Sequence, residues 1–189
     1  MKEGCGLAKR GGWCHREQVK RTLAALALVL CALLIRAGAQ QGLALGELRS
    51  LISQRYPTVR WVDTETLARW LARPPAERPV LLDAREEAEF EVSHIEGAVR
   101  IDPDAPNLAR VPRTEREIVV YCSVGYRSAA VAQKLMEAGR RRVYNLEGGI
   151  FAWAGEGRPL VSRGRSVRRV HPYDAAWGRL LDPALHSPL

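Results

Sequence analysis

The hydrophobic pattern changes from a continuous run to a helical spacing within the stretch Ile118 to Ala138. The β-branched and aromatic residues Ile118–Tyr121 form a short apolar run, which is typical of a strand buried on both faces. Between Ser128 and Ala138, apolar residues recur at the spacing of one helical face. Cys122 follows the predicted strand directly, on a short loop that leads into the predicted helix. Open α/β sheets bind ligands at this kind of position, so we expect the functional site here.

The same alternation of apolar runs and helical spacing extends over most of the chain. Further short strands are predicted at Val59–Val62, Val80–Leu82, Ala98–Ile101 and Val143–Leu146. Helices are predicted over Gly46–Tyr56 and Glu65–Leu71, from Glu86 onward, and in a short segment that ends at Trp153. Strands that alternate with helices through short connections indicate an α/β fold with a mainly parallel sheet.

The N-terminal stretch has the pattern of a signal peptide. Met1–Arg21 is polar and positively charged, and Thr22–Ile35 then carries no charge. This apolar run is shorter than the ~20 residues that a spanning helix needs. Ala37–Ala39 follows as a cleavage pattern, which predicts Gln40 as the mature N-terminus and export to the periplasm or cell envelope. An uncleaved membrane anchor and a buried helix of the folded domain are the alternatives.

The predicted leader changes how the cysteines and the net charge are interpreted. Three of the 4 cysteines, Cys5, Cys14 and Cys31, lie in the leader, so cleavage would leave Cys122 alone. A mature chain with one cysteine has no intramolecular disulfide and no cysteine-based metal site, and we expect no metal or cofactor. Much of the net charge of +8 lies in the leader, so it indicates targeting and not nucleic-acid binding.

The surroundings of Cys122 favour a reactive thiol. Loop amides and the dipole of the following helix would both stabilise an anion at the sulfur. Arg127 adds a permanent cation with a fork of donors that suits an oxyanion. Gly125 allows the loop to turn with its amides pointing inward. The alternative is a buried structural cysteine, which is common at strand ends.

Four short motifs follow one another along the chain, and only one of them is the Cys122 loop. They are Leu81–Arg85 (LLDAR), Ser93–Ala98 (SHIEGA), Val120–Ser128 (VYCSVGYRS) and Val143–Trp153 (VYNLEGGIFAW). With these motifs, the chain resembles the rhodanese-like sulfurtransferases over roughly Val62–Pro159. The resemblance implies a three-layer fold with a mainly parallel five-stranded sheet and helices on both faces.

The resemblance also implies a chemistry. Cys122 would take a sulfane sulfur from a donor such as thiosulfate, hold it as a persulfide and pass it to a thiol or cyanide. The implied substrate-binding residues are Ser123, Val124, Gly125, Tyr126, Arg127 and Ser128. Asp83 and Arg85 would brace the same end of the sheet, whereas from the residues alone they could form a surface ion pair of little consequence. Because Arg127 is the only cation of the loop, doubly charged thiosulfate would be a poor natural donor.

Two other functions compete with sulfur transfer. Cysteine phosphatases share the combination of cysteine, loop and arginine, but their signature spaces the two residues as C-x5-R. Cys122 to Arg127 is C-x4-R, with Tyr121 in place of the usual histidine, and this tighter loop suits a sulfur better than a phosphoryl group. A module that binds a partner or carries sulfur without catalysis is the third possibility.

The chain therefore divides into a leader, an extension, a rhodanese-like domain and a tail. These parts span residues 1–39, 40–61, 62–159 and 160–189. The tail is basic and irregular, and we expect it to be solvated with Tyr173 and Trp177 packed back on the domain. Contact with an acidic membrane surface or a partner protein is the alternative, while export disfavours nucleic acid. His94 is expected to bond backbone at a turn and to take no part in proton transfer.

Overall fold

The structure, a computed structural model, describes residue 40 and residues 44–188. The chain divides into two units, residues 1–40 and 41–189, and the account below concerns the second. The predicted signal peptide at 1–39 lies outside the described residues. Every helix among the described residues is too short or too polar to cross a bilayer.

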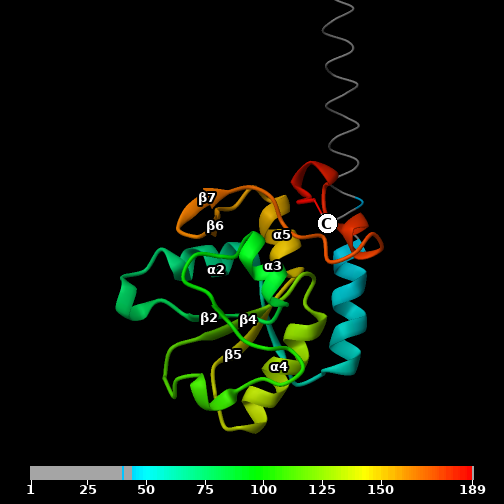
Figure 1. Cartoon of the computed structure of the whole chain (residues 1–189). Coiled ribbons are helices and arrows are strands. Elements are labelled where there is room, and N and C mark those ends of the chain that lie inside the picture. The colour runs from blue at the N-terminus through cyan, green and yellow to red at the C-terminus, as the bar shows by residue number, and fades with distance from the viewer. Residues whose placement is uncertain (1–39, 41–43, 189) are drawn as a thin grey trace, which may run out of the picture. The chain divides into compact units, whose positions relative to one another are not determined.

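Five parallel strands form the sheet at the centre of the domain (Figure 1). The strands are β1 (Arg60–Val62), β2 (Val80–Asp83), β3 (Val99–Arg100), β4 (Ile118–Tyr121) and β5 (Val143–Leu146). Their order across the sheet is β1-β5-β4-β2-β3, and each neighbouring pair is parallel. The predicted α/β fold and its five-stranded sheet are confirmed, with strand ends that differ from the prediction by at most one residue.

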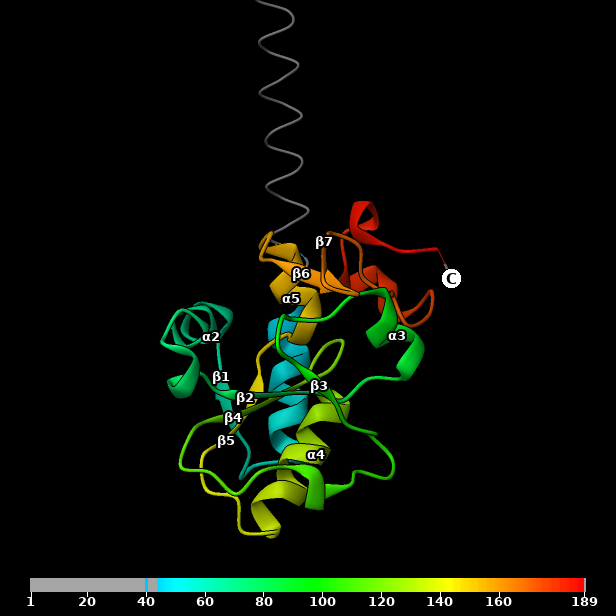
Figure 2. The same ribbon diagram turned by 60° about the vertical axis from the view of Figure 1, so that its left-hand side comes forward.

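Helices cover both faces of this sheet. They are the helix over 44–55, α2 (Thr64–Leu71), α3 (Glu87–Val92), α4 (Tyr126–Glu137) and α5 (Gly149–Gly155). Figure 2 shows α2 and α4 on opposite sides of the strands. Successive side chains of a strand point to opposite faces. Val119 therefore packs with residues of α2 and α5, whereas Val120 packs with residues of α4. Both faces of β4 are buried, as its continuous apolar run predicted.

Helix α4 begins at Tyr126, two residues before the predicted start at Ser128. Gly125 precedes it with φ 107°, in the left-handed region that favours glycine. The carbonyl oxygen of Gly125 already accepts the amide of Ala129 at 3.1 Å, so the helix starts immediately after the glycine. Arg127 consequently lies in the first helical turn and not on the loop.

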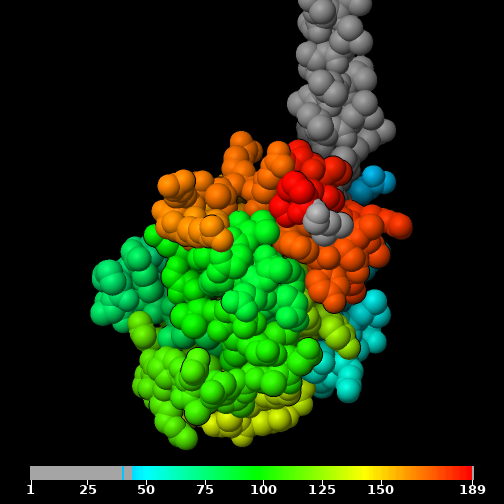
Figure 3. All heavy atoms as spheres, viewed as in Figure 1, coloured from blue at the N-terminus to red at the C-terminus, as the bar shows by residue number. Residues whose placement is uncertain are grey.

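The C-terminal residues are more ordered than the predicted irregular tail. Strands β6 (Leu160–Ser162) and β7 (Arg165–Val167) form an antiparallel hairpin. Two 3-10 turns follow, at Trp177–Leu180 and Pro183–Leu185. Figure 3 shows this orange and red segment seated against the green residues around α3. Leu160, Val170 and Leu181 of the segment are buried in the core, and such apolar residues hold it on the domain.

Candidate active site

The thiol of Cys122 lies at the carboxyl end of the central strand β4. Its side chain is 1% exposed, and the backbone N–H of Gly125 donates to its Sγ at 3.2 Å. Gly125 is the residue at which the chain turns into α4, so the same glycine makes the turn and supplies the donor. The dipole of the twelve-residue helix α4 also points its positive end at this loop. The sulfur thus sits where a negative charge is favoured.

Helix α5 fixes the other side of the loop. The amides of Ile150 and Phe151 donate to the carbonyl oxygens of Cys122 and Ser123, at 2.9 and 3.1 Å. Gly149 allows this approach, because a Cβ atom there would come within 2.6 Å of the Ser123 carbonyl oxygen. The carbonyl oxygens of Cys122 and Ser123 are thus turned toward α5, while the amide of Gly125 is directed at the thiol.

A buried amide side chain on the neighbouring strand holds the glycine. Asn145 of β5 is fully buried, and its Nδ2 donates to the carbonyl oxygen of Gly125 at 2.8 Å. The ring of Trp61 on β1 closes the space beside Gly125, where a Cβ atom would lie 3.2 Å from it. Strands β5 and β1, which lie on the same side of β4, therefore hold the loop at Gly125, while α5 holds it at Cys122 and Ser123.

The carboxylate of Glu89 on α3 accepts hydrogen bonds from both the loop and helix α4. Its carboxylate accepts Arg127 through both terminal nitrogens, at 2.7 and 2.8 Å, and also accepts the Ser123 hydroxyl at 2.9 Å. The carboxylate side chain is 2% exposed and the arginine side chain 22%. Burial by itself would raise the pKa of Glu89, but the hydrogen bonds and charge of Arg127 bring that pKa below its ordinary value.

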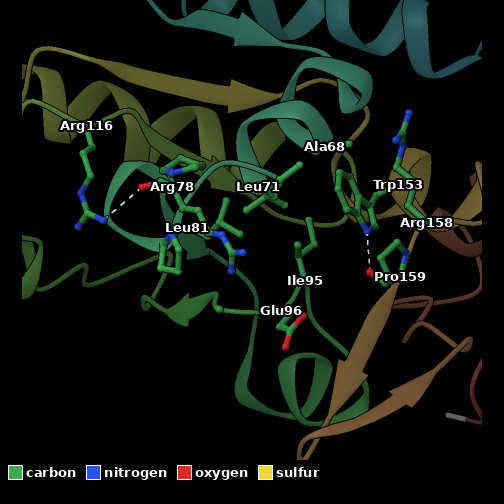
Figure 4. Close-up of a pocket in the computed structure, with 14 residues that line it drawn as sticks. Ala68, Leu71, Arg78, Leu81, Ile95, Glu96, Arg116, Trp153, Arg158 and Pro159 are labelled. Atoms are coloured by element: carbon green, nitrogen blue, oxygen red, sulfur yellow. Dashed lines mark hydrogen bonds between the residues drawn. The ribbon is translucent and has the colours of Figure 1, made fainter.

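A cavity of about 160 Å³ opens over the thiol. The residues that line it are Cys122, Ser123, Val124, Tyr126, Arg127, Tyr173 and Trp177. Its walls are thus the loop, the start of α4 and two aromatic residues from the C-terminal segment. Figure 4 shows a larger cavity of about 620 Å³ between α2, Ile95 and Trp153, which Cys122 does not line. Cys122 accordingly belongs to the smaller cavity.

Comparison with known proteins shows which family the chain belongs to. Residues 64–156 match the family described as Rhodanese-like domain. A protein named Sulfurtransferase from Allochromatium vinosum is 36% identical over 106 residues, which are 55% of this chain and 96% of that protein. The chain belongs to the rhodanese-like family. Family membership and this relative support sulfur transfer as the general chemistry of the domain.

Other relatives place the rhodanese-like domain in longer proteins. A tRNA uridine(34) hydroxylase from Cupriavidus taiwanensis is 34% identical over 140 residues, covering 69% of this chain and 48% of that protein. The crystal structure of the thiosulfate sulfurtransferase from Pseudomonas aeruginosa has a TM-score of 0.52 and 24% identity, covering 69% of this chain and 25% of that one. That likeness supports the rhodanese-like fold.

The rhodanese-like domain brings most of the predicted loop residues to one place. Cys122, Ser123, Val124, Tyr126 and Arg127 line the cavity over the thiol. Of the other two, Gly125 supplies its amide to Sγ, while Ser128 is buried in the first turn of α4. The predicted contact between Arg127 and a substrate stays a prediction, because both terminal nitrogens of Arg127 are bonded to Glu89 here.

Asp83 and Arg85 form a buried pair at the same end of the sheet. Arg85 donates through Nε and one terminal nitrogen to the two oxygens of Asp83, at 2.8 and 2.6 Å, and neither side chain is exposed. Arg85 also donates to the carbonyl oxygen of Ser93 at 2.6 Å, which ties β2 to the end of α3. The alternative of a surface ion pair is therefore wrong.

Several contacts of the rhodanese-like site were absent from the sequence prediction. Glu89 falls within the helix predicted from Glu86 onward without any local signal for a role in the site, and the approach of Gly149 to the loop gives no separate signal. Tyr173 and Trp177 were expected to pack on the domain, but their position over the thiol was not predicted. His94 contacts backbone as predicted, since its Nδ1 lies 3.0 Å from the Phe90 carbonyl oxygen, and its ring stacks on Phe90.

The lowered pKa of Glu89 predicts a pH-dependent contribution to stability. A depressed pKa in the folded state stabilises the protein fully above the unfolded value of about 4.3 and progressively less as pH falls through the folded value. Glu89→Gln should therefore lower the free energy of unfolding by about 2 kcal/mol at neutral pH, and by less at pH values below the unfolded pKa. Urea unfolding of both proteins across this range measures the difference.

Glu87→Gln is the matched control, because Glu87 lies on the same helix and is exposed. It should unfold like the unaltered protein at each pH. A difference between Glu89→Gln and the unaltered protein that stays constant down to acid pH would contradict a charged pair at this position.

Proposed function

We propose that this chain is a sulfurtransferase that moves a sulfane sulfur from a donor, such as thiosulfate, to a thiol or cyanide through a persulfide on Cys122. The observation that carries the proposal is the Gly125 amide at 3.2 Å from the sulfur, in a loop whose carbonyl oxygens are turned away toward α5. Family membership and the sulfurtransferase relative support the same chemistry.

The proposed reaction has two displacements at sulfur. The Cys122 thiolate attacks the outer sulfur of the donor, and the bond between that sulfur and the rest of the donor breaks with its electron pair leaving on sulfite. The persulfide then carries its negative charge on the terminal sulfur, next to the loop amides. An acceptor attacks this terminal sulfur, and the electron pair of the disulfide-type bond returns to Cys122 as thiolate.

In this proposal Arg127 is a positioning residue. Its guanidinium bridges Glu89 of α3 and the Ser123 hydroxyl of the loop, the latter at 3.0 Å. Burial would lower the pKa of Arg127, but its bonds to Glu89 and the nearby charges raise that pKa above the ordinary value. Arg127 therefore stays charged and fixes the loop, while the amides stabilise the charge on sulfur.

The pairing of Arg127 and the cavity at Cys122 favour sulfur transfer over a phosphatase and over a non-catalytic module. A phosphatase needs an arginine that can bind the phosphoryl oxygens, whereas here Glu89 occupies both terminal nitrogens of Arg127. A module that only binds a partner protein needs no cavity over a thiol, whereas Cys122 lines one. Both observations support an enzyme that exchanges sulfur with small molecules.

Removal of the thiol tests the proposal directly. Cys122→Ser should abolish both thiocyanate formation from thiosulfate and cyanide and the mass increase of one sulfur atom that donor treatment gives the unaltered protein. Cys31→Ser is the matched control in the full chain and should keep both properties. Phosphate release from an aryl phosphate that disappears in Cys122→Ser, without sulfur transfer, would instead identify a phosphatase.

We propose further that the protein is exported, on the pattern of a charged stretch, a short apolar core and Ala37–Ala39. N-terminal sequencing of protein recovered from the cell envelope should begin at Gln40. An intact Met1 in the membrane fraction would indicate an uncleaved anchor, and an intact Met1 in the cytoplasm would contradict export.

A further inference from the structure

The cavity over Cys122 is completed by residues outside the rhodanese-like match. The match ends at residue 156, yet Tyr173 and Trp177 line the cavity together with the loop. The C-terminal segment therefore forms part of the surface that a sulfur donor would contact. The proposed function by itself gives these two side chains no role.

The segment holds its aromatic residues in place by specific contacts. The amide of Val170 donates to the Leu185 carbonyl oxygen at 2.7 Å, and Val170 is fully buried. The carboxylate of Asp174 accepts the amide of Trp177 at 2.8 Å and so fixes the turn that presents the indole. Tyr173 has φ 69°, a conformation that a tyrosine keeps only where its surroundings impose it.

Tyr173 also covers the charge of Arg127. The guanidinium carbon lies 4.8 Å from the centre of the tyrosine ring, so the ring shields one face of the cation. Glu89 occupies the terminal nitrogens, and the carboxylate of Glu86 approaches one of them at 4.0 Å. One arginine thus faces two carboxylates and an aromatic ring, and it offers little free positive charge to a ligand in the cavity.

Apart from Cys122, Ser123 and Arg127, the residues that line the cavity are apolar or aromatic. These residues are Val124, Tyr126, Tyr173 and Trp177, and the cavity volume of about 160 Å³ is below the ~300 Å³ at which pockets for larger ligands begin. Such a cavity has room for a sulfur atom with one small apolar or planar group. A compact dianion would exchange its water shell for this surface without gaining a free cation.

We infer that Tyr173 and Trp177 form a specificity wall that favours sulfane donors with a single negative charge and an apolar or aromatic group over thiosulfate. The inference rests on the proposed function, because the wall acts on the donor of the Cys122 thiolate. With an organic thiosulfonate, the thiolate attacks the outer sulfur, the new S–S bond forms, and the electron pair of the broken bond leaves on the organic sulfinate. No other reactant is required.

Benzenethiosulfonate and thiosulfate make a matched pair of donors, since a phenyl ring replaces one charged oxygen. The unaltered protein should show a higher kcat/KM with benzenethiosulfonate. Tyr173→Ala and Trp177→Ala should each lower that value about three- to tenfold, as expected for the loss of an aromatic contact, and should change the value for thiosulfate much less. Tyr173→Phe keeps the ring and should keep the preference.

Arg179→Ala is the matched control, because Arg179 is exposed in the same segment and does not line the cavity. It should leave the ratio of the two kcat/KM values unchanged. Product inhibition of the unaltered protein gives a second readout that does not depend on how a variant folds. Benzenesulfinate should inhibit at a lower concentration than sulfite.

The outcomes separate this inference from the proposed function. A ratio that is the same in the unaltered protein, Tyr173→Ala and Trp177→Ala, or stronger inhibition by sulfite, overturns the specificity wall alone. An unaltered protein that gains no sulfur on Cys122 from either donor overturns the proposed function and this inference with it.

Discussion

The buried carboxylate of Glu89 places the strongest constraint on the active-site loop. A charge that is removed from water destabilises the fold unless it is paired and hydrogen-bonded, and here the partners are Arg127 and Ser123 on the far side of the site. Helix α3 orients the carboxylate, because Glu89 also accepts the backbone N–H of Glu86 at the start of that helix at 3.0 Å. The requirement to pair this charge therefore joins α3, the loop and the first turn of α4 into one unit.

The parallel sheet supplies the rest of the site. The carboxyl ends of parallel strands meet at one edge, so the loops after β2, β4 and β5 lie close together although they are distant in the sequence. Asp83 ends β2 and Arg85 lies in the loop after it, Cys122 lies in the loop after β4, and Gly149 begins α5 after the loop that follows β5. Each loop contributes a different kind of contact: a buried ion pair, the nucleophile, and amides that turn the loop carbonyls away from the thiol.

The sequence was sufficient for the fold and for the position of Cys122 at the end of β4. The continuous apolar run Ile118–Tyr121 could be placed as a buried strand because its pattern is local, and Cys122 followed from its position at the end of that strand. Contacts between distant segments could not be predicted in this way. Glu89 and Arg127 are paired by the packing of α3 beside α4, and nothing in either local pattern specifies that packing.

Differences at the ends of elements have a similar origin. Helix α4 begins early because Gly125 adopts a left-handed conformation that Asn145 and Trp61 stabilise from neighbouring strands. The C-terminal segment has an irregular, basic sequence, yet its few apolar residues find sites in the core and carry Tyr173 and Trp177 to the cavity. In both cases tertiary packing decides a local conformation that the sequence pattern leaves open.

Arg127, as we propose, acts on the loop through Glu89 and does not bind the donor by itself. The most direct test is kcat/KM with a single sulfane donor for Glu89→Gln, Arg127→Met and the double variant. If the arginine positions the loop, Arg127→Met leaves a buried carboxylate without its partner, and adding Glu89→Gln should restore part of the lost activity. A double variant that is no faster than Arg127→Met would contradict the account and would assign Arg127 to the donor.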